Sequence, residues 1–73
     1  MKLNVAVYRF VDLDRLEALR TRIDAAGRAL GLRGTVLLAP EGINLFASGA
    51  PEAIEAFLEH LAEDDRLRDL PVK

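Results

Sequence analysis

The sequence predicts an α+β fold in which one antiparallel sheet carries two helices on the same face. Two segments with helical periodicity alternate with short apolar segments, in the order strand, helix, strand, strand, helix, strand. The second and third strands are separated by a turn short enough for a hairpin. Of the 73 residues, 51% are hydrophobic and only three are proline, so the chain has enough apolar surface for one small core.

The first strand is expected over residues 3–11. Its side chains alternate between two apolar faces, one with Leu3, Val5 and Val7 and the other with Ala6, Tyr8 and Phe10. Because both faces are apolar, we expect this strand to lie inside the sheet rather than at its edge.

The first helix is expected to begin at Asp14, which is placed to cap it together with Glu17 three residues later. Gly31 is expected to end it. Gly27, inside the helix, costs about 1 kcal/mol relative to alanine, and we interpret it as tolerated rather than required for close packing. The apolar stripe of this helix consists of Leu16, Leu19, Ile23, Ala26 and Leu30.

A hairpin follows, with strands over residues 35–39 and 43–47. In the connecting Pro40-Glu41-Gly42, proline presets φ for the first central position and glycine accepts a left-handed conformation. Asn44 interrupts an otherwise apolar strand, so we expect its side chain to hydrogen-bond the backbone of the turn.

The second helix is expected to begin with Pro51 at its first position and to end at Asp64-Asp65. Leu70-Pro71-Val72 is expected to begin a last strand. With right-handed crossovers, the simplest arrangement of these elements is a ferredoxin-like sandwich over residues 1–73, with the first and third strands as central neighbours. The apolar stripe of the second helix consists of Ile54, Phe57, Leu58 and Leu61.

Composition excludes several classes of function. The chain has no cysteine and one histidine, so it offers neither a thiolate nucleophile nor a disulfide framework nor a cysteine-based zinc site. A net charge of −2 is not that of a self-sufficient nucleic-acid-binding protein. No apolar run approaches the roughly 18 residues of a membrane span, so we expect a cytoplasmic protein without a membrane partner. No catalytic residue, metal site or cofactor is predicted.

Several segments together resemble a known family. Tyr8-Arg9-Phe10-Val11, Leu30-Gly31-Leu32, the run from Gly34 to Gly49 and the ending Asp69-Leu70-Pro71-Val72-Lys73 are similar to the N-terminal domain of the rhodanese-domain tRNA uridine hydroxylases. This family was formerly called rhodanese-related sulfurtransferases. Leu45-Phe46 departs from the pattern, because many members have glycine and threonine after the asparagine.

The resemblance implies an acylphosphatase-like fold and a parent oxidoreductase that modifies tRNA by hydroxylating its wobble uridine. It places that chemistry in a rhodanese domain with a cysteine loop, which this chain does not contain. We therefore expect a non-catalytic accessory domain, an N-terminal fragment of a larger two-domain protein. The alternative is a stand-alone interaction or regulatory module that acts through the open face of its sheet.

Five residues are candidate contacts with a substrate or partner: Tyr8, Phe10, Glu41, Asn44 and Phe46. The aromatic residues form an apolar platform if the third strand presents Asn44 and Phe46 on the face of Tyr8 and Phe10. We favour burial of this platform in the core or against the following rhodanese domain. Stacking of bases from the tRNA anticodon arm and binding of a small ligand are the alternatives. Glu41 and Asn44 face the partner domain or the tRNA unless Asn44 holds the turn.

Charge is divided between the helices. The first carries Arg15, Arg20, Arg22 and Arg28, and the second carries Glu52, Glu55, Glu59 and Glu63. We interpret the helices as neighbours whose charges offset one another, with an ion-pair ladder along Arg20, Asp24 and Arg28. The alternative is that the arginines contact tRNA phosphates. The segment 11–15 is acidic and lacks glycine, which argues against acylphosphatase activity because that activity needs a phosphate-binding loop there.

Overall fold

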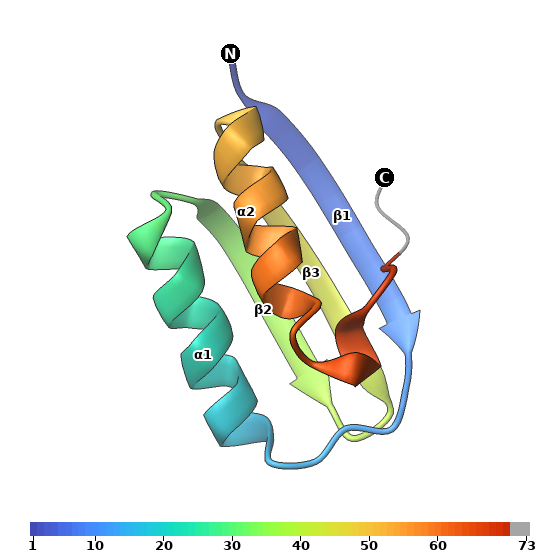
Figure 1. Ribbon diagram of the computed structural model, residues 1–73. Helices are drawn as coiled ribbons and strands as arrows, with labels where there is room; N and C mark the ends of the chain where they lie inside the picture. Colours follow the sequence, from blue (N-terminus) through green and yellow to red (C-terminus); the bar gives the residue numbers. More distant parts are fainter. Residues whose placement is uncertain (71–73) are drawn as a thin grey trace.

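The computed structural model describes residues 1–70 (Figure 1). Along the chain its elements are β1 (Leu3–Phe10), α1 (Leu16–Ala29), β2 (Arg33–Ala39), β3 (Gly42–Gly49), α2 (Pro51–Leu61) and the short 3₁₀ helix η1 (Asp65–Leu67). The strand expected to begin at Leu70-Pro71 lies almost entirely outside the described residues.

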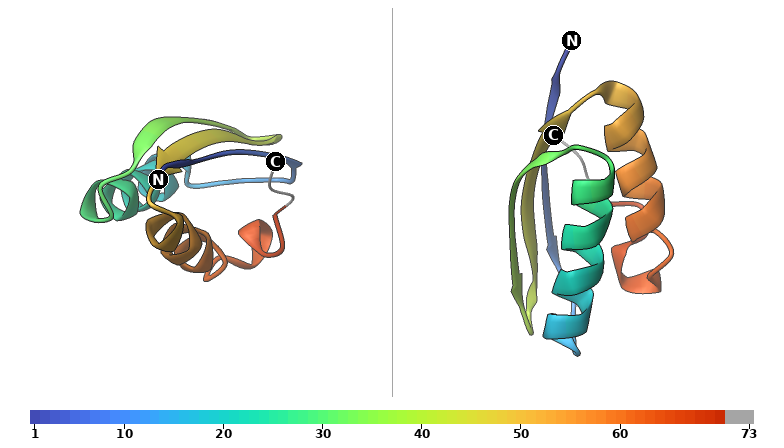
Figure 2. Two further views of the ribbon diagram at one scale, coloured as in Figure 1. Left: turned by 90° about the horizontal axis from the view of Figure 1, so that it is seen from above. Right: turned by 90° about the vertical axis from the view of Figure 1, so that its left-hand side faces the viewer.

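The three strands form an antiparallel sheet in the order β1-β3-β2, and the helices cover one of its faces (Figures 1 and 2). This arrangement confirms the predicted α+β, ferredoxin-like fold and the pairing of the first strand with the third. β3 is the central strand of this sheet. In the described part of the chain β1 lies at the edge of the sheet. The expected interior position rests on the predicted last strand, which falls outside the described residues.

The hydrophobic core lies between the sheet and the two helices. Both predicted helical stripes face it, because Leu19 and Ile23 of α1 and Ile54, Phe57 and Leu61 of α2 are buried. The sheet contributes Val5, Val7, Ile43, Leu45 and Ala47. Leu13 and Leu67 complete the core from the loop before α1 and from η1, two places to which the sequence analysis assigned no core residue.

The prediction for the start of α1 is wrong, whereas that for its end is confirmed. The N-cap is Arg15 in a left-handed conformation (φ 51°), and no side chain caps the helix. Asp14 instead accepts a hydrogen bond from Arg66 at 2.8 Å. At the other end, Gly31 has φ 70°, and the N–H groups of residues 31 and 32 bond the carbonyls of Arg28 and Gly27. This is the Schellman arrangement that glycine favours.

The hairpin turn consists of Pro40 and Glu41, because Ala39 already pairs with Gly42. Gly42 does not adopt the predicted left-handed conformation. Glycine is required there for another reason: a Cβ atom would collide with the carbonyl oxygen of Arg9 on β1. The close approach of β1 to β3 therefore determines this position.

α2 begins with proline in its first turn, as predicted, but ends at Leu61, before the acidic pair. Asp64 instead caps η1 by accepting a hydrogen bond from the backbone N–H of Arg66 at 3.0 Å. Arg66 also forms ion pairs with Asp64 (2.7 Å) and Asp14 (2.8 Å). The guanidinium of Arg66 holds the pKa of Asp64 below its usual value, mainly through the side-chain hydrogen bond. This network joins η1 to the loop before α1.

Arg9, on β1, also holds the end of the described chain in place. Its guanidinium donates to the backbone carbonyls of Arg68 at 2.6 Å and Asp69 at 2.8 Å, and more weakly to that of Arg66 at 3.4 Å. Asp69 has φ 55°, so the chain turns sharply where Arg9 holds it. The strand β1 and the segment after α2 are thereby tied together across nearly the whole sequence.

Candidate functional site: the open face of the sheet

The face of the sheet that the helices leave uncovered carries a regular array of side chains. Tyr8, Asn44 and Leu37 are directly opposite one another on β1, β3 and β2, and so share one row. Since side chains opposite one another point to the same face, the next row consists of Ala6, Phe46 and Thr35. The apolar platform was predicted on the condition that Asn44 and Phe46 share the face of Tyr8 and Phe10. The strand pairing fulfils this condition.

Four large apolar side chains on this face are exposed. Tyr8 is 55% exposed, Phe10 75%, Leu37 62% and Phe46 53%. The rings of Tyr8 and Phe10 meet edge to face, with their centroids 5.2 Å apart. These side chains therefore do not belong to the core of this domain. Of the two predicted kinds of burial, burial in the core is wrong, and burial against a following domain stays a prediction. A contiguous apolar face of this kind is typical of an interaction surface.

Leu37 also belongs to this surface, although it is not among the predicted contact residues. It stands in a continuous apolar run, Val36-Leu37-Leu38, which does not show which of its side chains face the helices. The signal that identifies it is the pairing of β2 with β3, because Leu37 lies opposite Asn44.

Four of the five predicted contact residues surround one hollow at the hairpin end of the sheet. The hollow measures about 230 Å³, and Tyr8, Phe10, Glu41 and Asn44 line it together with Leu37. Phe46 does not line it and lies one row away. The structure thus brings four of the candidates together and places the fifth on the same face.

The side chain of Asn44 does not hold the turn: within residues 1–70 no hydrogen bond joins the two. The turn is held instead by the loop after β1. The N–H of Val11 donates to the carbonyl of Glu41 at 3.0 Å, and the N–H of Leu13 donates to that of Pro40 at 2.9 Å. The amide of Asn44 is therefore available to a partner on the open face.

The same two hydrogen bonds also argue against acylphosphatase activity. A phosphate-binding loop needs backbone N–H groups that point at the ligand. In the loop after β1, the N–H groups of Val11 and Leu13 are already bonded to the hairpin, and Asp12 and Asp14 are exposed. The loop is thus unsuited to binding a phosphate.

The apolar rows of the open face carry no charge. By the pairing, the open-face positions are Asn4, Ala6, Tyr8 and Phe10 on β1, Gly42, Asn44, Phe46 and Ser48 on β3, and Arg33, Thr35, Leu37 and Ala39 on β2. Arg33 is the charged member of this set, and it lies in the row of Asn4 and Ser48, at the end of the sheet away from the hairpin. The nearest ionisable side chain along the hairpin is the exposed Glu41, which is acidic. A surface of this composition is better suited to packing against another protein surface than to binding a phosphate backbone.

The helices are neighbours, but their charges offset one another only in part. In the described part of the chain the one ion pair from α1 toward this side joins Arg22 Nη2 to Glu63 Oε1 at 4.0 Å, and Glu63 lies two residues after the end of α2. Both side chains are about half exposed or more, so this pair contributes at most about 1 kcal/mol. The predicted ladder along Arg20, Asp24 and Arg28 does not form an ion pair within residues 1–70.

Residues 1–70 bring no three potential metal ligands together. In the same part of the chain, neither helix has the length and apolar character that a membrane crossing requires.

The three-stranded antiparallel sheet with two helices on one face and an apolar open face defines the class of the protein as a small α+β domain with a ferredoxin-like fold. Comparison with known proteins identifies the family. Residues 3–73 match the family described as the UPF0176 acylphosphatase like domain, and the chain belongs to this family.

The chain is also similar to longer proteins. It is 54% identical over 70 residues to the tRNA uridine(34) hydroxylase of Bordetella avium, with 96% of this chain and 29% of the relative covered. It is 53% identical over 74 residues to the protein of the same name from Burkholderia thailandensis, with 96% of this chain and 25% of the relative covered. The chain therefore spans about a quarter of the length of these relatives.

Proposed function

We propose that this chain is the non-catalytic N-terminal domain of a cytoplasmic tRNA uridine(34) hydroxylase, and that it packs on the remainder of that protein through the open face of its sheet. The observation that carries the proposal is the exposed apolar array of Tyr8, Phe10, Leu37 and Phe46. The relatives supply the context, since their further residues amount to about two to three times the length that this chain covers, and the resemblance assigns them to a rhodanese domain.

The energetics favour a protein as the partner of this face. Burying a large apolar side chain completely contributes about 1.5–3 kcal/mol relative to leaving it exposed. These four side chains are each more than half exposed, so covering them contributes several kcal/mol, on the order of 1 kcal/mol each. No charged group has to be desolvated among the rows, and Asn44 offers one polar anchor to the partner.

A chimaera tests the proposal. The matching N-terminal segment of the Bordetella avium relative is replaced by this chain, and hydroxylation of tRNA uridine 34 is measured by mass spectrometry of tRNA digests. We expect the chimaera to be active and this chain alone to be inactive. Turnover by the purified chain alone would contradict the assignment as a non-catalytic domain.

Open-face variants locate the contact. In the chimaera, the double substitution Tyr8→Ser with Leu37→Ser is expected to lower activity and to make the junction between this domain and the remainder more sensitive to limited proteolysis. Leu3→Ser is the matched control, because Leu3 is also a large apolar residue, 42% exposed, but lies outside the open-face rows. Equal behaviour of the two variants would refute docking through this face. Concentration-dependent dimerisation of the chain, abolished by the same double substitution, would favour the stand-alone interaction module instead.

A further inference from the structure

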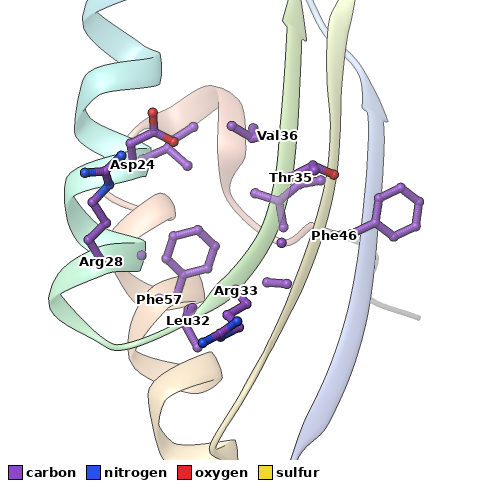
Figure 3. Close-up of a pocket in the computed structure, with 13 residues that line it drawn as sticks. Asp24, Arg28, Leu32, Arg33, Thr35, Val36, Phe46 and Phe57 are labelled. Atoms are coloured by element: carbon purple, nitrogen blue, oxygen red, sulfur yellow. The ribbon is translucent and has the colours of Figure 1, made fainter.

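The hollow between α1 and β2 is larger than the one at the hairpin, at about 410 Å³, but its apolar wall is part of the core (Figure 3). Ile23, Leu45 and Phe57 line it and are 3%, 2% and 3% exposed. A Cβ atom at Gly27 would meet Cε1 of Phe57 at 3.9 Å, an ordinary contact, so alanine fits there and close packing does not require the glycine. The ring of Phe46 points away from this hollow, on the other side of the sheet from Phe57 (Figure 3). Free apolar surface for a partner therefore lies on the open face.

The hollow at the hairpin end of the open face exists because two small residues lie beside a large one. Phe10, Gly42 and Ala39 are directly opposite one another on β1, β3 and β2. No side chain can fill the middle of this row, since a Cβ atom at position 42 would collide with the carbonyl oxygen of Arg9. The volume of about 230 Å³ is below the roughly 300–1,000 Å³ of small-molecule sites, so the hollow has the size for one side chain of a partner. The neighbouring row also lines it, with Tyr8, Asn44 and Leu37.

The walls of this hollow are free apolar and aromatic surface. Tyr8, Phe10 and Leu37 line it, and each is more than half exposed. The two rings stand at 89° to each other, so one presents its face where the other presents its edge. Since the face of an aromatic ring attracts a cation as well as an apolar group, these walls can hold a side chain that has both characters.

The turn beside the hollow is acidic. Glu41 lines the hollow, is exposed, and forms neither an ion pair nor a side-chain hydrogen bond within residues 1–70. Asp12, which is also exposed, lies in the loop that is bonded to this turn. Arg9 lines the hollow as well, but its guanidinium is bonded to backbone carbonyls after α2. The carboxylate of Glu41 is thus available to a cation from a partner.

We propose that this hollow receives one arginine side chain from the remainder of the full-length protein, an inference that rests on the proposed docking of the open face. An apolar occupant would leave the carboxylate of Glu41 desolvated and unpaired, which costs free energy. An arginine packs its stem and its planar guanidinium against the rings of Tyr8 and Phe10. Its guanidinium donates two hydrogen bonds to Glu41, and the side-chain oxygen of Asn44 is a further acceptor. Lysine lacks the planar fork of donors that this arrangement uses.

Cross-linking in the chimaera with the Bordetella avium relative identifies the occupant. The photoreactive residue p-benzoylphenylalanine is placed at position 10, and after irradiation mass spectrometry locates the residue joined to it. We expect a residue of the remainder, with an arginine at or beside the point of attachment. A cross-link to a segment of the remainder without arginine would refute this inference and leave the docking proposal intact. A cross-link to a second copy of this domain, or none at all, would contradict the docking proposal itself.

Exchange of the two charges then tests the pair. A specific protease site at the junction of the chimaera allows the domain and the remainder to be separated and their Kd to be measured. Glu41→Arg, or glutamate in place of the identified arginine, is expected to weaken binding at least about tenfold, the loss that corresponds to hydrogen bonds with a charged group. The two changes together are expected to restore most of the affinity, and a double variant as weak as the single ones would overturn the inference.

Two controls separate the pair from general charge and from folding. Glu55→Arg reverses an exposed glutamate of α2 that does not line the hollow, and we expect it to leave the Kd within about twofold. An equal loss in Glu55→Arg would contradict a specific site. Glu41→Arg is expected to leave the urea midpoint of the 73-residue chain unchanged, because the side chain of Glu41 is exposed and unbonded. A lower midpoint would attribute the lost binding to unfolding and contradict the inference.

Discussion

Arg9 is expected to contribute measurably to the stability of the domain, although it lies at the periphery of the core. Its guanidinium donates two short hydrogen bonds, at 2.6 Å and 2.8 Å, to backbone carbonyls of residues 68 and 69. A hydrogen bond contributes about 0.5–1.5 kcal/mol net, and we take the lower part of this range because both bonds are exposed. Their loss should therefore lower the free energy of unfolding by about 1–2 kcal/mol.

The test variant is Arg9→Met, because methionine keeps an apolar stem but removes the guanidinium donors. For a domain of this size, the expected loss of unfolding free energy corresponds to a fall in Tm of about 4–16 °C. Thermal unfolding measures the change in Tm, and urea titration measures the loss of free energy directly. Arg9→Lys is the control for charge, since an ammonium group does not present the planar fork of donors that reaches two carbonyls, and we expect it to recover only part of the loss. Amide exchange at residues 66–69 should accelerate in parallel. A midpoint of Arg9→Met within error of the unmodified chain would refute the reasoning.

Gly27→Ala should raise the free energy of unfolding by about 0.5–1 kcal/mol, because alanine favours the helix and its Cβ has room; Gly31→Ala should lower it, because φ is 70° there. Urea midpoints check both, and a lower midpoint for Gly27→Ala would contradict the finding that a Cβ atom fits against Phe57 at ordinary contact distance. Since Arg66 lowers the pKa of Asp64 from its usual 3.8, the stabilisation is fully present above that value and is lost as pH falls below it through the lower, folded-state pKa. Asp64→Asn should remove this acid-dependent part of the urea midpoint between pH 2 and 5, and an unchanged profile would contradict the assignment. Phe10→Ser should change the stability of the chain by no more than about 0.5 kcal/mol, because the side chain is 75% exposed, and a larger loss would show that Phe10 belongs to the core.

The parts of the fold that were predicted well are those encoded by neighbouring residues. Both helical stripes follow from apolar residues three or four positions apart, and Leu19, Ile23, Ile54 and Phe57 are buried as expected. Gly31 ends α1 as its freedom at positive φ predicts. The strand pairs follow from the order of elements and the shortness of the hairpin.

Two predictions were wrong because a residue far away in the sequence, rather than a neighbour, determines what the position does. Asp14 has the identity of a helix cap, but its carboxylate binds Arg66, which lies 52 positions further along the chain. Gly42 has the identity of a turn glycine, but its backbone is not left-handed, and the carbonyl of Arg9 on β1 determines the position. Neither competing partner is visible in the local sequence.

The sequence by itself determined the order of the elements from β1 to α2, the fold class, the family resemblance and four aromatic or polar members of the open face, because these depend on periodicity and on residue identity. Only the tertiary structure decided that Leu37 joins them and that Arg9 holds the segment after α2. The first depends on strand register, and the second depends on how the segment after α2 is placed against β1. Register and placement come from packing between elements far apart in the chain, so no local pattern of residues specifies them.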